Sequence, residues 1–224
     1  MGEMISMIAH QWRQPLSTIT LQIANLQLKH MLNNERRCKD VDDALSNISN
    51  TIIYLSETID DFQTYFRPNK ESVTIELQEL LQRAVNFALT RVHDRGISLT
   101  VDKQNSITLK TYANELVQVI LNILNNAIDA HNEAKSPNPF ITLDTLIEKE
   151  FITISIHDNA GGIAKEHLSR LFEPYFSTKG KNGTGLGLYM SKMIVENQFG
   201  GEIVVQTSGG ETTFSVKIPI SLKN

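Results

Sequence analysis

The spacing of apolar residues divides the chain into a helical N-terminal part and a mixed C-terminal part. Over about residues 3–66, apolar side chains recur at steps of three or four, in two series separated by the polar stretch NNERR at residues 33–37. The second series keeps a heptad spacing, which is typical of helices that pack along one stripe. The two series are Ile5, Ile8, Trp12, Leu16, Ile19, Ile23 and Leu26, and then Val41, Leu45, Ile48, Ile52, Leu55, Ile59, Phe62 and Phe66. The pattern predicts two helices joined by a turn, an antiparallel hairpin.

A hairpin with one apolar stripe on each helix cannot bury both stripes well by itself. Two hairpins packed into a four-helix bundle do bury them, so we expect a homodimer through the N-terminal hairpin. Arg67-Pro68-Asn69 ends the second helix and is typical of a linker, because proline cannot continue a helix. The predicted domains are therefore residues 1–68, the helical hairpin, and residues 69–224.

Residues 69–224 interleave strands and helices without the regular alternation of a parallel α/β fold. This order favours an α+β fold, with helices on one face of a mixed sheet. Helices are expected at residues 79–91, 114–134 and 186–199, and strands at residues 73–77, 97–101, 107–111, 140–147, 151–157, 202–207 and 212–220. The last two strands flank a turn at Gly209-Gly210.

The composition is that of an ordinary globular chain, with 41% hydrophobic and 21% charged residues. The formal net charge of −4 gives no sign of a general nucleic-acid-binding surface. A single cysteine, Cys38, excludes an internal disulfide and favours a reducing compartment. No apolar run reaches membrane-spanning length. We therefore expect a cytoplasmic protein, or the cytoplasmic part of a membrane-anchored sensor whose remaining segments lie upstream.

The segment HQWRQPL at residues 10–16 sets a histidine close to a proline within the first predicted helix. Helical spacing puts His10 nearly opposite the apolar stripe, with Gln14 one turn further along the same face. A lone histidine on such a face is usually a solvated surface residue. Pro15, however, removes one backbone hydrogen bond and bends the helix just after His10. Because neutral imidazole is a competent nucleophile near neutral pH, His10 is a candidate acceptor.

Two further motifs carry groups suited to a nucleotide and a cation. Asn122 and Asn126 lie four residues apart on the polar face of the helix at 114–134, and side-chain oxygens at this spacing can jointly approach Mg²⁺. The segment DNAGGI at residues 158–163 directly follows a strand, so that Asp158 can accept a hydrogen bond from an exocyclic amine while the glycines permit close approach. Taken alone, these motifs are also compatible with solvated asparagines and a simple turn.

A second glycine motif, GTGLGL at residues 183–188, opens the helix at 186–199. It is neither a Walker loop, since no Gly-Lys-Ser/Thr follows, nor a dinucleotide fingerprint, since no strand precedes it. Free N–H groups at the start of a helix still form a cradle for phosphate. Between the two glycine motifs, LFEPYFSTKG at residues 171–180 joins bulky anchors to a flexible tail, which is typical of a lid.

The order of these motifs resembles the histidine kinase family, within the wider group of ATPases that includes gyrase, Hsp90 and MutL. Over nearly the whole chain, residues 10–16 resemble the phosphoacceptor box, residues 122–127 the asparagine box, residues 158–162 and 183–188 the two glycine boxes, and residues 171–176 the phenylalanine box. The resemblance implies a dimeric four-helix bundle followed by an ATP-binding α/β sandwich of the GHKL, or Bergerat, type. It implies autophosphorylation of His10 from ATP and Mg²⁺, followed by transfer to an aspartate of a response-regulator receiver domain.

Individual roles follow from the same resemblance. Asp158 is expected to contact the adenine amine, Asn122 and Asn126 to serve the Mg²⁺ site, and Lys179 to reach the phosphates from the lid. Thr212 is expected to help hold the adenine. The other nucleotide-binding residues are expected to be Gly161, Gly162, Gly183, Thr184, Gly185, Leu186 and Gly187.

Three positions bear on the reaction. Most of the family has Glu or Asp directly after the histidine, whereas Gln11 can orient an imidazole but cannot take its proton. Gln14 stands where many relatives position a hydrolytic water, which suggests a phosphatase activity toward a phosphorylated partner. Asn122 stands where gyrase-type relatives carry the glutamate that activates water, so transfer is favoured over hydrolysis. Two alternatives remain: a plain ATPase of the same fold, and a non-catalytic module that binds nucleotide and dimerises.

Overall fold

The computed structural model describes residues 16–28, 41, 44–46, 48, 49, 52, 71–102, 107–134, 136, 138–179 and 185–222. The chain divides into two compact units, one made of Met1–Asp61 with Thr178–Thr184 and the other of Phe62–Ser177 with Gly185–Asn224. The domain boundary predicted between residues 68 and 69 lies outside the described residues and stays a prediction.

The described residues of the first unit are largely helical. Residues 16–28 form a helix, and residues 41, 44–46, 48, 49 and 52 are also helical, as the apolar pattern predicts. Four apolar positions of the two predicted stripes are 43–54% exposed in the single chain: Leu16, Ile23, Leu45 and Ile52. The turn between the two predicted helices lies outside the described residues.

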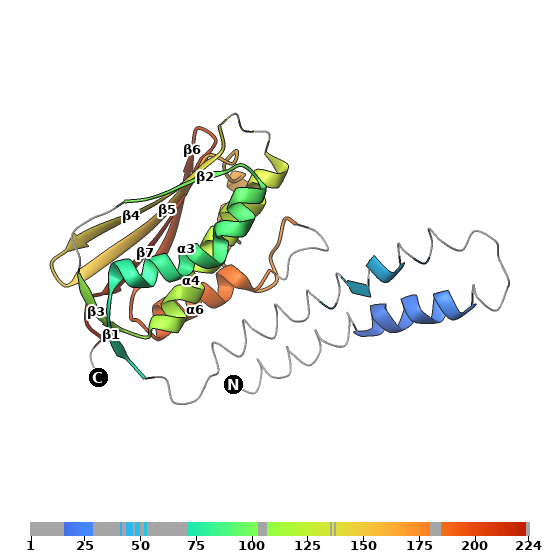
Figure 1. The fold of residues 1–224 in the computed structure, drawn as a ribbon, viewed down its shortest axis with the longest axis horizontal. Helices are drawn as coiled ribbons and strands as arrows, with labels where there is room; N and C mark the ends of the chain where they lie inside the picture. Colours follow the sequence, from blue (N-terminus) through green and yellow to red (C-terminus); the bar gives the residue numbers. More distant parts are fainter. Residues whose placement is uncertain are drawn as a thin grey trace. The chain divides into compact units, whose positions relative to one another are not determined.

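A five-stranded mixed sheet forms the centre of the second unit (Figure 1). Its strand order is β2-β4-β5-β7-β6, in which β2 runs parallel to β4 and the other neighbours are antiparallel. The strands are β2 (Ser98–Val101), β4 (Phe140–Glu148), β5 (Phe151–Asp158), β6 (Glu202–Ser208) and β7 (Glu211–Pro219). The mixed sheet expected from the sequence is confirmed.

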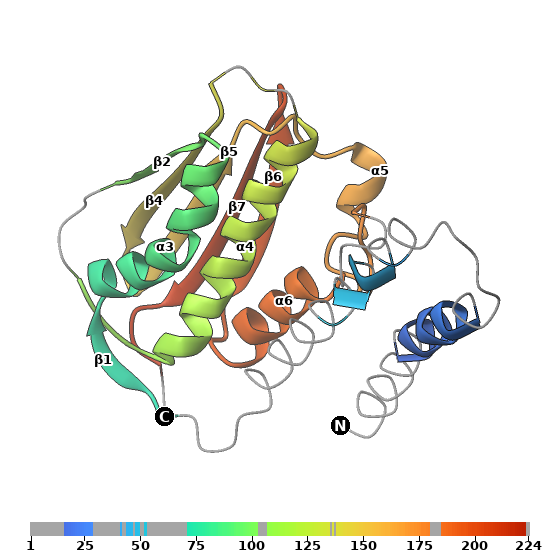
Figure 2. The same cartoon turned by 45° about the vertical axis from the view of Figure 1, so that its right-hand side comes forward.

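Among the described helices, three cover one face of this sheet (Figure 2): α3 (Leu77–Asp94), α4 (Ala113–Glu133) and α6 (Gly187–Asn197). Helix α4 buries the stripe that its sequence predicts, which consists of Leu116, Ile120, Ile123, Leu124 and Ala127. Alternate side chains of β5, from Ile152 to Ile156, are buried beneath the helices, as expected for a strand with one covered face. The predicted layer of helices on one face is therefore confirmed.

The strands expected at residues 73–77 and 107–111 are present, but their pairing and one short helix were not predicted. Strand β1 (Val73–Glu76) pairs with β3 (Thr108–Thr111) in a separate two-stranded antiparallel sheet rather than joining the main one. A short helix, α5 (Lys165–Leu168), follows the first glycine motif.

Tight turns close the two hairpins of the main sheet. Strands β4 and β5 are joined at Lys149, which has a positive φ of 54°. Strands β6 and β7 are joined by Gly209 and Gly210 with φ of 62° and 86°, as a two-residue turn with positive φ at both positions requires. A search of the described helices finds none long and apolar enough to cross a membrane.

Candidate functional site

Three polar side chains form a row across one end of the main sheet, on the face that the helices cover. Asp158 at the end of β5 pairs with Thr212 of β7, and Thr212 pairs in turn with Thr207 of β6. Asp158 and Thr212 are only 3% and 4% exposed. Because side chains opposite one another on paired strands point to the same face, these residues are neighbours on that face. The structure thus brings together the two residues that the sequence assigned to adenine.

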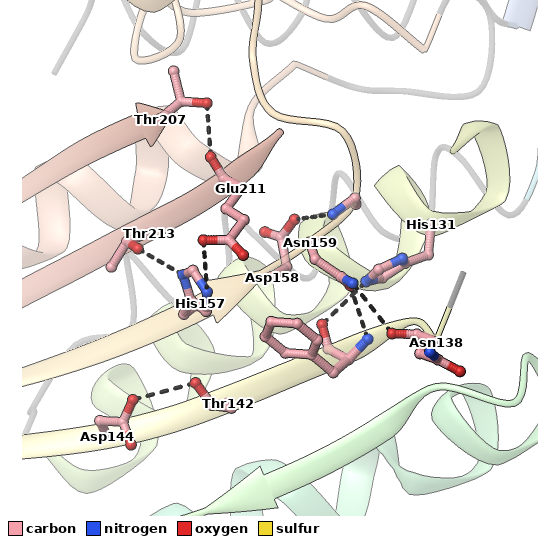
Figure 3. Close-up of polar contacts among 12 residues, drawn as sticks. His131, Asn138, Thr142, Asp144, His157, Asp158, Asn159, Thr207, Glu211 and Thr213 are labelled. Atoms are coloured by element: carbon pink, nitrogen blue, oxygen red, sulfur yellow. Dashed lines mark hydrogen bonds and ion pairs between the residues drawn. The ribbon is translucent and has the colours of Figure 1, made fainter. Parts of the chain in front are cut away.

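The Asp158 carboxylate is buried and held in place by its own loop. Its Oδ1 accepts a hydrogen bond from the backbone N–H of Ala160 at 3.0 Å (Figure 3). Burial raises the pKa of Asp158 above its usual 3.8, while the Ala160 hydrogen bond and the nearby His131 and His157 act in the opposite direction. A desolvated carboxylate of this kind is a strong hydrogen-bond acceptor, because water does not compete for it.

The glycines after Asp158 lie against the β6–β7 hairpin. The N–H of Gly161 donates to the carbonyl of Gly210 at 2.9 Å, and the N–H of Ile163 donates to Thr207 Oγ1 at 3.0 Å. Gly162 has φ of 78°, and a Cβ there would stand 2.9 Å from Thr207 Oγ1. Space and backbone conformation together therefore require glycine at position 162.

Asn159 has a structural role that its residue type did not reveal. Its side-chain Oδ1 accepts from the N–H of Phe140 at 2.9 Å, and its Nδ2 donates to the carbonyl of Asn138 at 3.1 Å (Figure 3). The Ser136 hydroxyl donates to the Asn159 carbonyl at 2.6 Å. These bonds fasten the connection between α4 and β4 to the end of β5, directly beside Asp158.

Asn122 lies where α4 meets the start of α6. Its Nδ2 donates to the Gly187 carbonyl at 3.4 Å and to Ser191 Oγ at 3.3 Å, while its Oδ1 accepts from Gln118 Nε2 at 3.4 Å. Asn126, one turn later on α4, is half-buried. The asparagine motif and the second glycine motif, far apart in sequence, are therefore neighbours in the fold.

Tyr175 of the predicted lid segment contacts Gly185 of the second glycine motif. The Tyr175 N–H donates to the Gly185 carbonyl at 2.9 Å, and Tyr175 itself has φ of 69°. Gly185 has φ of 64°, and a Cβ there would stand 2.7 Å from the Tyr175 Cα. Only glycine fits this close backbone contact.

The remaining predicted residues are placed as follows. The side chain of Leu186 is buried in the interior, so only its backbone is available to a ligand. Gly187 is the first residue of α6, and Lys179 belongs to the first compact unit. His10, Gln11, Gln14, Gly183 and Thr184 lie outside the described residues.

Among protein families, residues 111–222, half of the chain, match the histidine kinase-, DNA gyrase B- and HSP90-like ATPases. The matched segment contains the polar row, the asparagine motif and both glycine motifs.

Curated proteins similar to the chain include two-component sensor PprA of Pseudomonas aeruginosa, with 26% identity over 99% of this chain and 24% of PprA. Another is signal transduction histidine-protein kinase AtoS of Escherichia coli, with 30% identity over 99% of this chain and 35% of AtoS. The chain thus spans a quarter to about a third of the length of these two relatives.

Among solved structures, histidine kinase ThkA in complex with response regulator protein TrrA is similar, with a TM-score of 0.71 and 21% identity over 98% of this chain and 61% of that one. At this identity the likeness shows the fold. The family match covers the strands and helices that build the polar row. The chain therefore belongs to the histidine kinase-, DNA gyrase B- and HSP90-like ATPase family, and its second unit is an α/β sandwich catalytic domain of the histidine kinase type.

Proposed function

We propose that the chain binds ATP with Mg²⁺, transfers the γ-phosphoryl group to His10, and passes it on to an aspartate of a response-regulator receiver domain. The observation that carries the proposal is the buried pair of Asp158 and Thr212 on neighbouring strands of a catalytic domain of this family. The named relatives are a two-component sensor and a signal transduction histidine-protein kinase, which supports the same reaction.

In this proposal the adenine binds over the polar row. The Asp158 carboxylate accepts a hydrogen bond from the exocyclic amine, and burial makes that bond stronger than it would be in water. Thr212 offers a hydroxyl beside the same edge of the base. Gly161 and Gly162 have no side chains, so the base can lie close to their backbone. A purine that lacks the amine leaves the buried carboxylate unpaired, which gives selectivity for adenine.

The phosphates in this proposal lie toward the start of α6. Gly183, Thr184, Gly185, Leu186 and Gly187 supply backbone N–H groups at or before the N-terminus of an 11-residue helix, where anions are favoured. The amide oxygens of Asn122 and Asn126 fit the preference of Mg²⁺ for oxygen ligands. We assign Lys179 to the phosphates as well, from the predicted lid.

No group of three or more His, Cys, Asp and Glu side chains within the described ranges could hold a metal ion. In the proposal, the two asparagines would hold the cation together with phosphate oxygens and water, because Mg²⁺ prefers oxygen ligands and keeps several waters. When bound, Mg²⁺ neutralises charge that develops on the transferred phosphoryl group.

The proposed acceptor is the imidazole of His10. Gln11 accepts a hydrogen bond that orients the ring, and because an amide cannot hold a proton, base catalysis is weak or is supplied elsewhere. Gln14 is proposed to position a water that removes the phosphoryl group from the partner. If Gln14→Ala leaves the rate of partner dephosphorylation unchanged, that last assignment is wrong.

We further propose a homodimer through the N-terminal hairpin and a receiver domain as the second partner. The exposed apolar positions of the first unit, such as Leu16 and Leu45, support the dimer, because a soluble helix rarely leaves a regular apolar stripe uncovered. The solved ThkA complex holds a response regulator, which supports the choice of partner. A kinase that uses ATP and a receiver domain acts in the cytoplasm, the proposed location.

Incubation with γ-labelled ATP and Mg²⁺ tests the proposal. Wild-type chain is expected to acquire an acid-labile label, because phosphohistidine is hydrolysed by acid, while the His10→Ala chain stays unlabelled and the Asp158→Asn chain is labelled more slowly at the same ATP concentration. Released phosphate without labelled protein would identify a plain ATPase instead. Nucleotide binding with neither label nor release would identify a non-catalytic module.

A further inference from the structure

Thr207 completes the row that begins with Asp158 and Thr212, yet no motif assigns it a role. It is the cross-strand partner of Thr212 and is half-buried on the same face of the sheet. Its hydroxyl oxygen Oγ1 accepts a hydrogen bond from the Ile163 N–H at 3.0 Å. The same hydroxyl donates to the Glu211 carbonyl at 2.8 Å (Figure 3). One hydroxyl thus joins the loop after Asp158 to the start of β7.

The contact is also steric. A Cβ on Gly162 would stand 2.9 Å from Thr207 Oγ1, so the loop backbone rests directly against this oxygen. A second link, from the Gly161 N–H to the Gly210 carbonyl at 2.9 Å, lies next to it. The loop therefore keeps its position through two hydrogen bonds and one close contact with the β6–β7 hairpin.

The position of the loop and the orientation of Asp158 are coupled. The loop starts at Asp158, whose Oδ1 accepts from the Ala160 N–H, and it ends where the Ile163 N–H meets Thr207. Movement of the far end therefore changes the backbone that holds the carboxylate at the near end. A fixed loop pre-organises both the acceptor for the adenine amine and the glycine surface under the base.

We propose that Thr207 is a positioning residue of the nucleotide site, which acts through the backbone of Gly161–Ile163; this inference rests on the proposed binding of ATP. Thr207→Val keeps the shape and β-branching of the side chain but removes both hydrogen bonds of the hydroxyl. Loss of one to two such bonds corresponds to about a tenfold weaker affinity for nucleotide. Thr207→Ser keeps the hydroxyl and should bind within about twofold of wild type.

Thr213 offers a matched control on the same hairpin. Its hydroxyl makes one hydrogen bond, with the side-chain atom His157 Nδ1 at 2.9 Å. As the neighbour of Thr212 along β7, however, it points to the opposite face of the sheet. Thr213→Val therefore removes a hydroxyl hydrogen bond between β7 and β5 without touching the loop, and it should bind nucleotide like wild type.

The experiment titrates ADP with Mg²⁺ into the full chain by calorimetry, for wild type and the three variants, and follows hydrogen exchange of the Ile163 amide. We expect about tenfold weaker binding and faster Ile163 exchange for Thr207→Val alone. The rate of phosphoryl transfer at saturating ATP should be unchanged, because the reacting groups are untouched. Thr207→Ala, which also removes the hydroxyl, serves if the valine variant does not fold.

Two results overturn the inference while leaving the proposed function intact. One is a folded Thr207→Val chain that binds nucleotide with wild-type affinity. The other is a loss of affinity in Thr207→Ser and Thr213→Val that equals the loss in Thr207→Val. A wild-type chain that binds no nucleotide overturns the proposed function itself, and the inference with it.

Discussion

Asp158 and Thr212 are direct cross-strand partners on β5 and β7, and both side chains are buried beneath the helix layer. Two polar side chains in such a place need partners, because burying an unsatisfied polar group is costly. The Ala160 N–H satisfies part of the carboxylate, and the proposed ligand supplies an amine for the rest. This pair is therefore the most informative place to perturb the domain.

Replacement of Asp158 by asparagine should separate binding from folding. The amide introduced by Asp158→Asn keeps an oxygen for the Ala160 N–H but loses the charge that strengthens a bond to the adenine amine. A charge-assisted hydrogen bond contributes about 1.5–3 kcal/mol, so the affinity for ADP should fall about 10- to 100-fold. Calorimetric titration measures this loss, and an unchanged affinity would remove Asp158 from the adenine site.

The same variant should show how burial of the Asp158 charge affects stability. Because burial raises the pKa of Asp158, the folded chain holds a proton that the unfolded chain releases near pH 3.8. Stability from this residue is present below pH 3.8 and falls as pH rises through the higher folded pKa. In thermal unfolding without nucleotide, the stability of Asp158→Asn relative to wild type should increase as pH rises from 3.8 to the higher folded pKa. A constant difference at every pH would contradict this.

Alanine substitutions at two glycines of the second motif should differ sharply. Gly185→Ala forces a left-handed φ on alanine and sets its Cβ against the Tyr175 backbone, so the free energy of unfolding should fall by about 1–3 kcal/mol. At Gly187 the nearest atom to a new Cβ is 3.7 Å away, in the Asn122 amide, so Gly187→Ala should stay within about 0.5 kcal/mol of wild type. Urea unfolding measures both, and equal effects would refute the Tyr175 contact.

Asn159 should matter for stability through its two side-chain hydrogen bonds, to Phe140 and Asn138. Asn159→Ala removes both and leaves the Phe140 N–H unpaired, which should lower the free energy of unfolding by about 2 kcal/mol. Asn132 is exposed near the end of α4 and provides the control. Asn132→Ala should change the free energy of unfolding by less than about 0.5 kcal/mol. If both variants unfold at the same urea concentration, the Asn159 contacts contribute nothing to stability.

Elements governed by local pattern were predictable from the sequence. The buried stripe of α4 and the Gly209-Gly210 hairpin follow from apolar spacing and turn chemistry within a few residues. The pairing of β1 with β3 was not predictable, because both strands are four residues long and their partner is chosen by distant packing.

The candidate site could be predicted only in part, because local sequence does not reveal contacts between residues that are distant along the chain. Asp158 and the glycines belong to motifs whose order resembles a known family, so they could be named from the sequence. Thr207 and Asn159 act through hydrogen bonds to residues that are distant in sequence, and a threonine in a strand or an asparagine in a turn gives no local sign of this. Leu186 shows the converse, since its place in the glycine motif does not reveal that its side chain is buried.

The fate of the γ-phosphorus in a single turnover tests the central claim most directly. Chain in excess over γ-labelled ATP, with Mg²⁺, is quenched in base at successive times, and the label is divided among ATP, free phosphate and the peptide that contains His10. The account predicts that the label moves from ATP to that peptide before any free phosphate accumulates, and that Asp158→Asn slows this step at the same concentrations. Label that passes straight from ATP to free phosphate, with none on His10, would contradict it.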